Sequence, residues 1–256
     1  MRKLQIMPKL KELVEVPMSV KLELTDFVID KQLRELGHNI AVAWSGGKDS
    51  TLVLWFVLQR YPDIPVIFNN TGIEYPETIA FVREITSAWS LNLFETKPIK
   101  TFWQCVDEYG FPHVKNSRSK TKTANGSAPT PRCCYWLKER PAQLAYREVK
   151  AKGIFTGITA VENRNRQLVA IQHGTCYRLK KTGLTQIHPI LYWTENEVRQ
   201  FHSDNNIPLN EVYSKGCDRC GCSCCTAFLS WESQLSRMNP KLYAMVKLRK
   251  DGQYVM

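Results

Sequence analysis

Short apolar runs alternate with segments of helical spacing through the middle of the chain. Strands are predicted where the apolar runs are short and bounded by turn residues, at 40–44, 65–70, 91–96 and 153–159. Helices are predicted between them, at 51–58, 79–89 and 135–150. Strands that alternate with helices form right-handed βαβ units on a parallel sheet. The pattern therefore predicts an α/β protein with a Rossmann-like, doubly wound and mostly parallel sheet.

Further elements are predicted on either side of this pattern. The apolar positions of residues 22–33 have the spacing of an amphipathic helix, with Thr25 or Asp26 as its N-cap. A strand at 188–194 is predicted to lead into a helix at 195–205. We expect three regions, an N-terminal helical segment, a domain containing the sheet, and a cysteine-rich segment with a C-terminal helix, at 1–38, 39–215 and 216–256.

The turn between the first strand and its helix reads Ser45-Gly46-Gly47-Lys48-Asp49-Ser50. A strand, a glycine turn and a helix N-terminus form an anion site, because backbone N–H groups and the helix dipole converge there. Gly46 and Gly47 let the backbone approach phosphate oxygens closely. Lys48 supplies a positive charge, and the two serines supply hydroxyl donors. Asp49 would repel phosphate groups unless Mg²⁺ lies between them, so the turn predicts a site for phosphate with Mg²⁺.

These six residues resemble the pyrophosphate loop (PP-loop) of the N-type ATP pyrophosphatases, the adenine nucleotide α-hydrolase superfamily. Proteins of that superfamily hold the β,γ-pyrophosphate of ATP while a nucleophile attacks the α-phosphorus. The resemblance implies that 39–215 is a nucleotide-binding domain with ATP as its ligand. It also implies catalytic roles for Lys48 and Asp49.

A second signature follows the strand at 65–70. The segment Thr71-Gly72-Ile73-Glu74-Tyr75-Pro76-Glu77-Thr78 resembles the Thr-Gly-x-x-x-Pro-Glu-Thr signature of the branch named after phosphoadenylylsulfate (PAPS) reductase. Ligands of parallel sheets bind at the carboxyl ends of the strands. We therefore expect the nucleotide site to include Asn70, Thr71, Gly72 and Glu74 beside the loop.

Two basic segments are candidates for contact with anions. The segment 160–166 occupies the place where PAPS reductase-like proteins carry arginines that face the substrate anion, which implies that Arg164 and Arg166 hold phosphate or sulfate bidentately. A solvated loop is the alternative for both arginines. The stretch 115–132 contains five lysines and arginines and no acidic residue. It is predicted to be either a mobile loop or a loop that folds onto a phosphate backbone.

Composition and charge narrow the choice of partners. The chain has 256 residues, of which 43% are hydrophobic, and can bury a full core. It has no apolar run of about eighteen residues, so we expect no membrane span. Its start lacks an apolar signal core, which predicts a cytoplasmic protein. The net charge of +11 favours an anionic partner, with DNA or another nucleic acid as the first candidate; a basic enzyme acting on small nucleotides is the alternative.

The cysteines indicate metal or redox chemistry. Seven of the nine lie in two groups, Cys133-Cys134 and the five between Cys217 and Cys225. Such clustering in a chain without a signal peptide argues against a disulfide framework. A Cys-Cys pair, a long gap and a Cys-x-x-Cys supply four thiolates, which suits a [4Fe–4S] cluster or tetrahedral zinc. Cys105 and Cys176 stand alone and are predicted to be buried apolar residues.

A resemblance to the adenylylsulfate (APS) reductases that bear a cluster implies which cysteines are ligands. Those proteins carry Cys-Cys ahead of a basic helix and, later, Gly-Cys-x-x-Cys-Thr. The second string matches 221–226. The implied ligands of the [4Fe–4S] cluster are therefore Cys133, Cys134, Cys222 and Cys225. Cys217 and Cys220 have the same spacing and remain alternates, and a site of six or seven thiols that exchanges sulfur is a further alternative. Zinc remains the alternative metal.

Two features separate the chain from the APS and PAPS reductases. Their version of the loop has lost the lysine, whereas Lys48 is present here, as in a loop built for ATP. They also use a cysteine in a Glu-Cys-Gly-Leu-His-like string near the C-terminus, whereas the last cysteine here is Cys225. We therefore rank reduction of APS or PAPS second among the possible activities of the protein.

The expected function is that of an ATP pyrophosphatase that adenylates an acceptor for sulfur insertion, with a cysteine desulfurase as the sulfur donor. The acceptor we favour is the DNA backbone, because the signature at 71–78 and the string Cys-Tyr-Trp-Leu-Lys at 134–138 resemble the ATP pyrophosphatase component of DNA phosphorothioation systems. The alternatives are tRNA thiolation, an APS or PAPS reductase of sulfate assimilation, and a non-catalytic subunit that senses nucleotides. The oligomeric state is left open, a homo-oligomer included.

Overall fold

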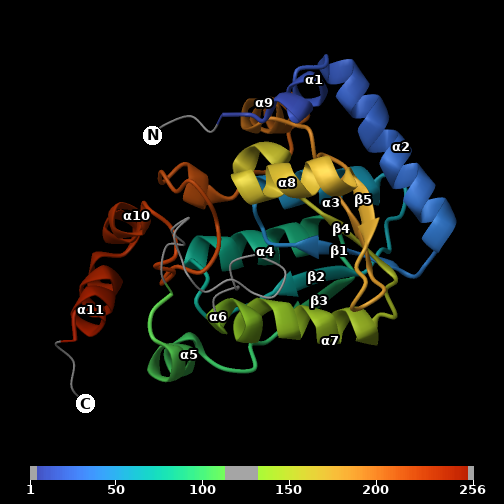
Figure 1. Ribbon diagram of the computed structural model, residues 1–256. Helices are drawn as coiled ribbons and strands as arrows, with labels where there is room; N and C mark the ends of the chain where they lie inside the picture. Colours follow the sequence, from blue (N-terminus) through green and yellow to red (C-terminus); the bar gives the residue numbers. More distant parts are fainter. Residues whose placement is uncertain (1–4, 113–131, 253–256) are drawn as a thin grey trace. The chain divides into compact units, whose positions relative to one another are not determined.

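The computed structural model describes residues 5–112 and 132–252 (Figure 1). Contacts divide the chain into two compact units. The first, which we call the sheet unit, comprises residues 1–68, 81–94 and 145–210. The second, the cysteine unit, comprises residues 69–80, 95–144 and 211–256. The predicted basic loop at 115–132 lies outside the described residues except for Arg132.

A six-stranded sheet confirms the predicted fold class. Its strands run in the order β3-β2-β1-β4-β6-β5. Strand β1 lies parallel to β2 and β4, β4 lies parallel to β6, and β5 is antiparallel to β6. The strand bounds are Ile40–Trp44 (β1), Val66–Asn69 (β2), Leu93–Thr96 (β3), Gly153–Thr156 (β4), Cys176–Arg178 (β5) and Thr185–Ile187 (β6). The first four strands are those that the apolar runs predict.

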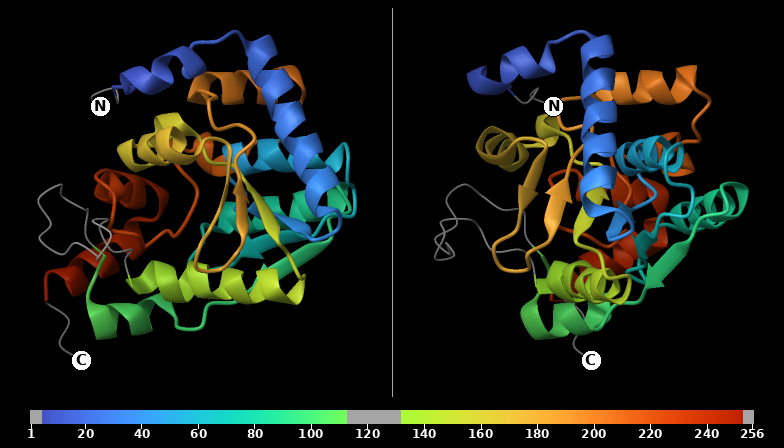
Figure 2. Two further views of the ribbon diagram at one scale, coloured as in Figure 1. Left: turned by 45° about the vertical axis from the view of Figure 1, so that its right-hand side comes forward. Right: turned by 90° about the vertical axis from the view of Figure 1, so that its right-hand side faces the viewer.

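Helices cover both faces of this sheet. Helix α3 (Lys48–Leu58) follows β1 directly and buries its apolar side chains, while the C-terminal part of α7 (Arg140–Glu148) packs its Ala145 against strand residues Ala41, Ile67 and Ile154. The two helices lie on opposite faces, as Figures 1 and 2 show. The other helices with residues in the sheet unit are α1 (Pro8–Val14), α2 (Met18–Leu36), α4 (Pro76–Ala88), the 3₁₀ turn η2 (Ala160–Glu162), α8 (Arg164–His173) and α9 (Glu195–Asp204).

The predicted N-cap of the first long helix is wrong. Helix α2 begins at Met18, with Pro17 as its N-cap, so that Thr25 and Asp26 lie in its interior. Thr25 is fully buried, where its hydroxyl donates to the carbonyl of Pro189 and accepts a hydrogen bond from the indole of Trp193. Thr25 therefore does not cap α2 but links it by hydrogen bonds to the segment 189–193.

The predicted strand at 188–194 is also wrong. Strand β6 ends at Ile187, and the backbone then turns twice, with Leu191 N–H donating to His188 and Trp193 N–H donating to Ile190. Pro189 has no N–H to offer a strand neighbour, which favours such a turn. The helix that follows, predicted at 195–205, is confirmed as α9.

The cysteine unit is mainly helical. Its elements are α5 (Phe102–Tyr109), α6 (Arg132–Cys134), a π-helical turn η1 (Tyr135–Glu139), the start of α7, the 3₁₀ turn η3 (Glu211–Tyr213), α10 (Trp231–Met238) and α11 (Pro240–Lys250). A core of Phe102, Leu137, Trp231, Leu235 and Val246 joins α5, η1, α10 and α11. Within the described residues no helix is long and apolar enough to cross a membrane.

Candidate nucleotide site and cysteine cluster

The loop between β1 and α3 closes on itself through its two serine hydroxyls. Ser45 Oγ lies 3.1 Å from Ser50 Oγ, and Ser50 Oγ donates to the carbonyl of Gly47 at 3.0 Å. The N–H of Ser45 also donates to Ser50 Oγ, at 3.2 Å. These bonds hold the turn in one shape. Because the first N–H groups of a helix have no acceptor within the helix, the turn presents them at the start of α3.

Lys48 and Asp49 lie together at the first turn of α3. Lys48 Nζ is 3.0 Å from Asp49 Oδ2 and 3.9 Å from Glu195 Oε1, and its side chain is only 11% exposed. The loop therefore carries a positive charge next to a carboxylate. The ammonium group of Lys48 is suited to binding phosphate oxygens, and the carboxylate of Asp49 is suited to binding a divalent cation.

Gly157 is part of this site, although sequence reasoning did not identify it. A Cβ atom at this position would come within 2.4 Å of Ser50 N and 2.5 Å of Asp49 C. Both contacts are with backbone, so any larger residue would displace the loop. The signal available in the sequence was a glycine within the strand predicted at 153–159, near its carboxyl end, where ligands of parallel sheets bind.

The two arginine candidates lie in the first turn of α8. Asn163 caps this helix, and its side chain accepts the N–H of Arg166 at 3.0 Å. The guanidinium of Arg166 pairs with the carboxylate of Glu162, and Arg164 is exposed. A helix N-terminus with two arginines suits an anion.

His188 is a buried titratable group in the same unit. Its Nδ1 lies 2.6 Å from the hydroxyl of Thr156 at the end of β4. Its Nε2 has no partner among the described residues. Burial, with a smaller effect of Arg166, lowers the pKa of His188 to about 4, so the ring is neutral at physiological pH.

The residues after β2 form a turn within the cysteine unit. The amide of Asn70 donates to Glu95 at 2.7 Å and its oxygen accepts the N–H of Gly72 at 3.0 Å. Gly72 has a φ of 76°, which favours glycine. The hydroxyl of Thr71 donates to Glu74 at 2.7 Å. Through this turn the structure brings Thr71 and Glu74 to the cysteines.

Cys222 and Cys225 lie on one tight turn beside that segment. Cys225 N–H donates to the carbonyl of Cys222 at 3.2 Å, and the Cys222 thiol lies 3.6 Å from the hydroxyl of Thr71. A backbone bridge also pairs Cys222 with Glu74. Ser223 fixes the turn further, because its N–H and hydroxyl both donate to the carbonyl of Ile73, at 2.8 and 2.9 Å.

The Cys133-Cys134 pair faces this turn from the start of a helix. A hydrogen bond between the two thiols raises the pKa of Cys133, and Cys222 and Cys225 are both close enough to raise it further. The same hydrogen bond lowers the pKa of Cys134, with help from the ammonium of Lys138. The structure thus places Cys133 near Cys222 and Cys225, which come from a segment that lies far away in the chain.

Lys138 is a second residue of importance that sequence reasoning missed. Its ammonium hydrogen-bonds with Cys222 and is close to Glu74 and Cys134. The nearby sulfur of Cys222 raises the pKa of Lys138, while burial raises the pKa of the Cys222 thiol itself. A positive charge among thiols stabilises their anionic forms. The available signal was a lysine one helical turn after Cys134, on the same helix face.

Cys217 and Cys220 have different neighbours. Cys217 is buried with Tyr75 and Val212, and the charged groups around it are Arg237, Glu77 and Asp218. Cys105 is buried, as predicted, but Cys176 on β5 is only half-buried, so the prediction for it is wrong. In a strand as short as β5 at the edge of the sheet, one side chain is easily left partly exposed.

No three of the described histidine, cysteine, aspartate and glutamate side chains are placed to hold a single metal ion. Zinc bound by four thiolates has Zn–S bonds of about 2.3 Å and draws its ligands into one compact group. A [4Fe–4S] cluster is larger, because each cysteine binds a different iron atom. Four thiolates are the donor set of both groups.

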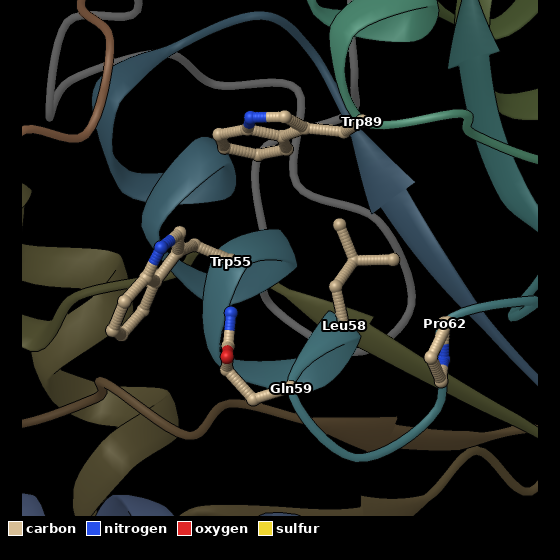
Figure 3. A pocket seen from close by; sticks show the side chains of 5 residues that line it. All are labelled: Trp55, Leu58, Gln59, Pro62 and Trp89. Carbon is tan, nitrogen blue, oxygen red and sulfur yellow. The ribbon is translucent and has the colours of Figure 1, made fainter.

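A pocket of about 260 Å³ lies on α3 away from its loop end (Figure 3). Its lining residues are Trp55, Leu58, Gln59, Pro62 and Trp89. None of these five side chains is charged or nucleophilic, so this pocket offers no groups for phosphate binding or catalysis. We therefore place the candidate chemistry at the loop and at the cysteines.

Two curated relatives indicate what the chain is similar to. It is 28% identical over 232 residues to an uncharacterized protein of Methanocaldococcus jannaschii, covering 87% of this chain but 51% of that protein. It is 27% identical over 185 residues to the phosphoadenosine 5′-phosphosulfate reductase of Buchnera aphidicola, covering 72% and 69%. The chain thus spans about half the length of the archaeal relative.

Solved structures share the fold at lower identity. The PAPS reductase of Candida auris superposes with a TM-score of 0.58 at 18% identity, covering 86% of this chain and 97% of that one. The FMN adenylyltransferase of Candida glabrata, solved with FMN and the ATP analogue AMPCPP, gives 0.53 at 16% identity, covering 83% and 69%. The U34-tRNA thiolase of Methanococcus maripaludis, solved with its [4Fe–4S] cluster, gives 0.50 at 17% identity, covering 92% and 77%.

A family model described as the phosphoadenosine phosphosulfate reductase domain matches residues 39–228. This match covers the sheet, the loop and the cysteines. The chain therefore belongs to the phosphoadenosine phosphosulfate reductase domain family.

Proposed function

We propose that this member of the family is an ATP pyrophosphatase that adenylates an oxygen atom of an acceptor and so prepares that oxygen for replacement by sulfur. The observation that carries the proposal is Lys48 in the loop Ser45–Ser50, at the start of α3. APS and PAPS have no β,γ-pyrophosphate to neutralise, whereas ATP presents one to the loop. A largely enclosed lysine at this position is thus better explained by ATP than by a sulfated nucleotide.

The fold comparisons support nucleotide binding of this kind. The adenylyltransferase structure of similar fold contains an ATP analogue. The reaction class, attack on an α-phosphorus with pyrophosphate as the leaving group, uses the parts that the loop offers. We place Mg²⁺ at Asp49, where it would neutralise phosphate charge when bound, and we assign anion contacts to Arg164 and Arg166 in the first turn of α8.

The proposed chemistry has two steps. An oxygen of the acceptor attacks the α-phosphorus of ATP, an O–P bond forms, and pyrophosphate leaves with the electron pair of the bond that breaks. The Lys48 ammonium and the N–H groups of the first turn of α3 stabilise the charge on the transferred phosphorus. Hydrosulfide then attacks the activated acceptor atom, and AMP leaves with the oxygen. Sulfur replaces oxygen without a net change in oxidation state at the acceptor.

The cysteine cluster fits a [4Fe–4S] group that participates in sulfur chemistry. Cys133, Cys134, Cys222 and Cys225 would hold it, and Lys138 would offset its negative charge. When bound by four cysteines, such a cluster would supply electron transfer, because no iron is left open to another ligand. The tRNA thiolase of similar fold, solved with a [4Fe–4S] cluster, supports this assignment. A cysteine desulfurase is the proposed source of the sulfur; it carries the sulfur as a persulfide, and a thiol reductant, itself oxidised to a disulfide, releases it as hydrosulfide.

The acceptor that we propose is the DNA backbone, as in DNA phosphorothioation. The net charge of +11 supports a nucleic acid, and the signature at 71–78 supports this branch of the superfamily. tRNA thiolation is the closest alternative, favoured by the thiolase structure. Reduction of APS or PAPS is the other alternative, favoured by the similarity to the PAPS reductase of Buchnera aphidicola.

The proposal is tested by release of pyrophosphate from ATP by protein purified without oxygen. The comparison includes DNA, tRNA or no nucleic acid, and the variant Lys48→Ala. The matched control is Lys31→Ala, which removes an exposed lysine of α2 in the same unit. We expect DNA to stimulate release and Lys48→Ala to lower it by at least about a hundredfold, the scale of losing one charge that stabilises a transition state, with the control unchanged.

The other outcomes identify the alternatives. Stimulation by tRNA and not by DNA would assign tRNA thiolation. Sulfite formed from APS, with no pyrophosphate released from ATP, would overturn the proposal in favour of a reductase. Binding of ATP without any turnover would favour a nucleotide sensor.

A further inference from the structure

The backbone carbonyls of the loop have to point away from bound phosphate, because both carry negative charge. Gly47 O is accounted for within the loop, since it accepts from Ser50 Oγ at 3.0 Å and from Thr51 N–H at 2.9 Å. The carbonyls of Gly46 and Lys48 lie on either side of it. Both receive hydrogen bonds from a segment of the chain more than 150 residues away.

His202 on α9 supplies the donor to Lys48. Its side chain is 1% exposed, and its Nε2 lies 2.8 Å from the carbonyl oxygen of Lys48. Its Nδ1 lies 3.2 Å from the carbonyl oxygen of Ile207. A carbonyl oxygen only accepts hydrogen bonds, so the contact of 2.8 Å makes Nε2–H the donor to Lys48.

Asn210 supplies the donor to Gly46. Its side chain is 2% exposed, and its Nδ2 donates to the carbonyl oxygen of Gly46 at 3.1 Å. The turn that joins it to His202 is fixed as well, because Ile207 N–H donates to the carbonyl of His202 at 2.9 Å. Asn206 within this turn has a φ of 52°, a conformation that asparagine tolerates. One short segment therefore presents both donors.

We propose that His202 and Asn210 are positioning residues for the phosphate site: they hold the carbonyls of Lys48 and Gly46 away from the ligand, so that the loop N–H groups face its phosphate groups. The inference rests on the proposed binding of ATP at Ser45–Ser50 and names the residues that set its affinity. Neither residue reaches the phosphate itself. Their effect passes through the backbone of the loop.

Substitutions at His202 can separate this role from packing. Glutamine places its amide nitrogen where Nε2 of histidine lies, whereas asparagine places it where Nδ1 lies. His202→Gln therefore keeps the donor to Lys48, and His202→Asn keeps only the contact with Ile207. Asparagine is the smaller residue, so the thermal stability of both variants is measured beside binding.

The experiment is titration calorimetry of the full chain with AMPCPP and Mg²⁺, and separately with inorganic pyrophosphate. We expect His202→Asn to raise the dissociation constant for both ligands about tenfold. A tenfold change corresponds to about 1.4 kcal/mol, the free energy that one hydrogen bond contributes. We expect His202→Gln to stay within about threefold of the natural protein, since the hydrogen bond to Lys48 is retained. His38→Asn is the control, because His38 is exposed and bonds to Tyr61.

Equal affinities for the two His202 variants would overturn the inference while leaving ATP binding intact. Asn210→Asp supplies a second test if His202→Asn does not fold. It keeps the shape of the side chain but replaces the donor to Gly46 with a carboxylate oxygen, and an unchanged dissociation constant would again overturn the inference. If the natural protein binds pyrophosphate but not AMPCPP, the proposed function fails while the positioning role is judged on pyrophosphate. If it binds neither, both fail.

Discussion

The two candidate sites are built in different ways. The phosphate loop takes its binding groups from six consecutive residues, and most of its internal hydrogen bonds join atoms within Ser45–Ser50. The cysteine cluster takes its groups from side chains of three separate segments, at 71–74, 133–138 and 222–225. One site is a property of a local backbone shape, and the other is a property of how distant segments pack.

This difference predicts how each site responds to change. The proposed loop site would bind largely through backbone N–H groups. Apart from Lys48, most substitutions of its side chains would leave those groups in place, and the other sensitive positions would be those where another segment touches the backbone. The proposed cluster would be held by side chains, so each single substitution would remove a ligand or a charge. Gly157 for the loop and Cys225 for the cluster are the positions that test this contrast best.

Gly157→Ala is expected to have the largest effect at the loop. The added Cβ would lie 2.4 Å from Ser50 N and 2.5 Å from Asp49 C, and neither backbone atom can move without opening the start of α3. We expect a loss of stability of about 3 kcal/mol and a loss of affinity for AMPCPP of at least about a hundredfold. Urea unfolding and titration calorimetry measure the two effects.

Gly153→Ala is the matched control on the same segment of chain. Its Cβ would meet the ends of the Leu36 and Ile187 side chains, at 2.3 and 3.2 Å. Side-chain ends can change rotamer, so a cost of about 1 kcal/mol and unchanged binding are expected. If both glycine variants bind AMPCPP equally well, the close approach at Gly157 does not shape the site.

Cys225→Ser is expected to remove the cluster. In protein purified without oxygen and reconstituted with iron and sulfide, we expect iron to fall from about four atoms per chain to less than about one, because a [4Fe–4S] cluster needs all four thiolates. Metal analysis and visible absorption measure this loss. Zinc found in place of iron in the natural protein would contradict the assignment of the metal.

Cys220→Ser is the control for this variant. Cys220 has the same spacing from Cys217 as Cys225 has from Cys222, but it packs against the buried residues Tyr75, Val212 and Cys217. We expect its iron content to match that of the natural protein. Loss of iron from Cys220→Ser with retention in Cys225→Ser would assign the ligand role to the alternate pair.

The difference between a local site and a site assembled from distant segments also explains which features could be predicted from the sequence alone. The loop, its strand and its helix are contiguous, so their spacing and their glycines predict them together, and the strands at 40–44 and 65–70 are confirmed for the same reason. The prediction of Thr25 as a cap was wrong because its partners, Pro189 and Trp193, lie more than 160 residues away. Local patterns cannot reveal that a threonine will be buried by another segment.

Residues that act on a site from a distance were missed for the same reason. Gly157, His202 and Asn210 support the loop from remote parts of the chain, and Lys138 supports the cysteines. Each is an ordinary residue in its own local sequence. Only the packing of strands and helices gives it a role, because a single sequence reports spacing along the chain and not proximity in space.

His188 allows a smaller test of how distant packing affects the sheet unit. In the unfolded chain its pKa is near 6.5, whereas burial lowers the folded value to about 4. Below pH 6.5 the unfolded state therefore binds a proton that the folded state does not, so the stability present above pH 6.5 is lost as the pH falls toward 4. Between pH 7 and pH 4.5 this one group accounts for about 2 kcal/mol of lost stability.

His188→Asn removes the titrating ring but keeps a side-chain amide near the hydroxyl of Thr156, the group that Nδ1 contacts at 2.6 Å. The variant leaves a gap and is less stable at pH 7, so the useful quantity is the change with pH and not the absolute value. We expect the free energy of unfolding, measured in urea, to fall between pH 7 and pH 4.5 by about 2 kcal/mol less in the variant than in the natural protein.

Proton NMR of the His188 ring in the natural protein provides the direct check, because a ring that titrates near pH 6.5 in the folded state cannot contribute this loss of stability. Such a result would mean that water or an ion reaches Nε2 at the ends of β4 and β6, and that this part of the sheet is less tightly packed than the loop beside it.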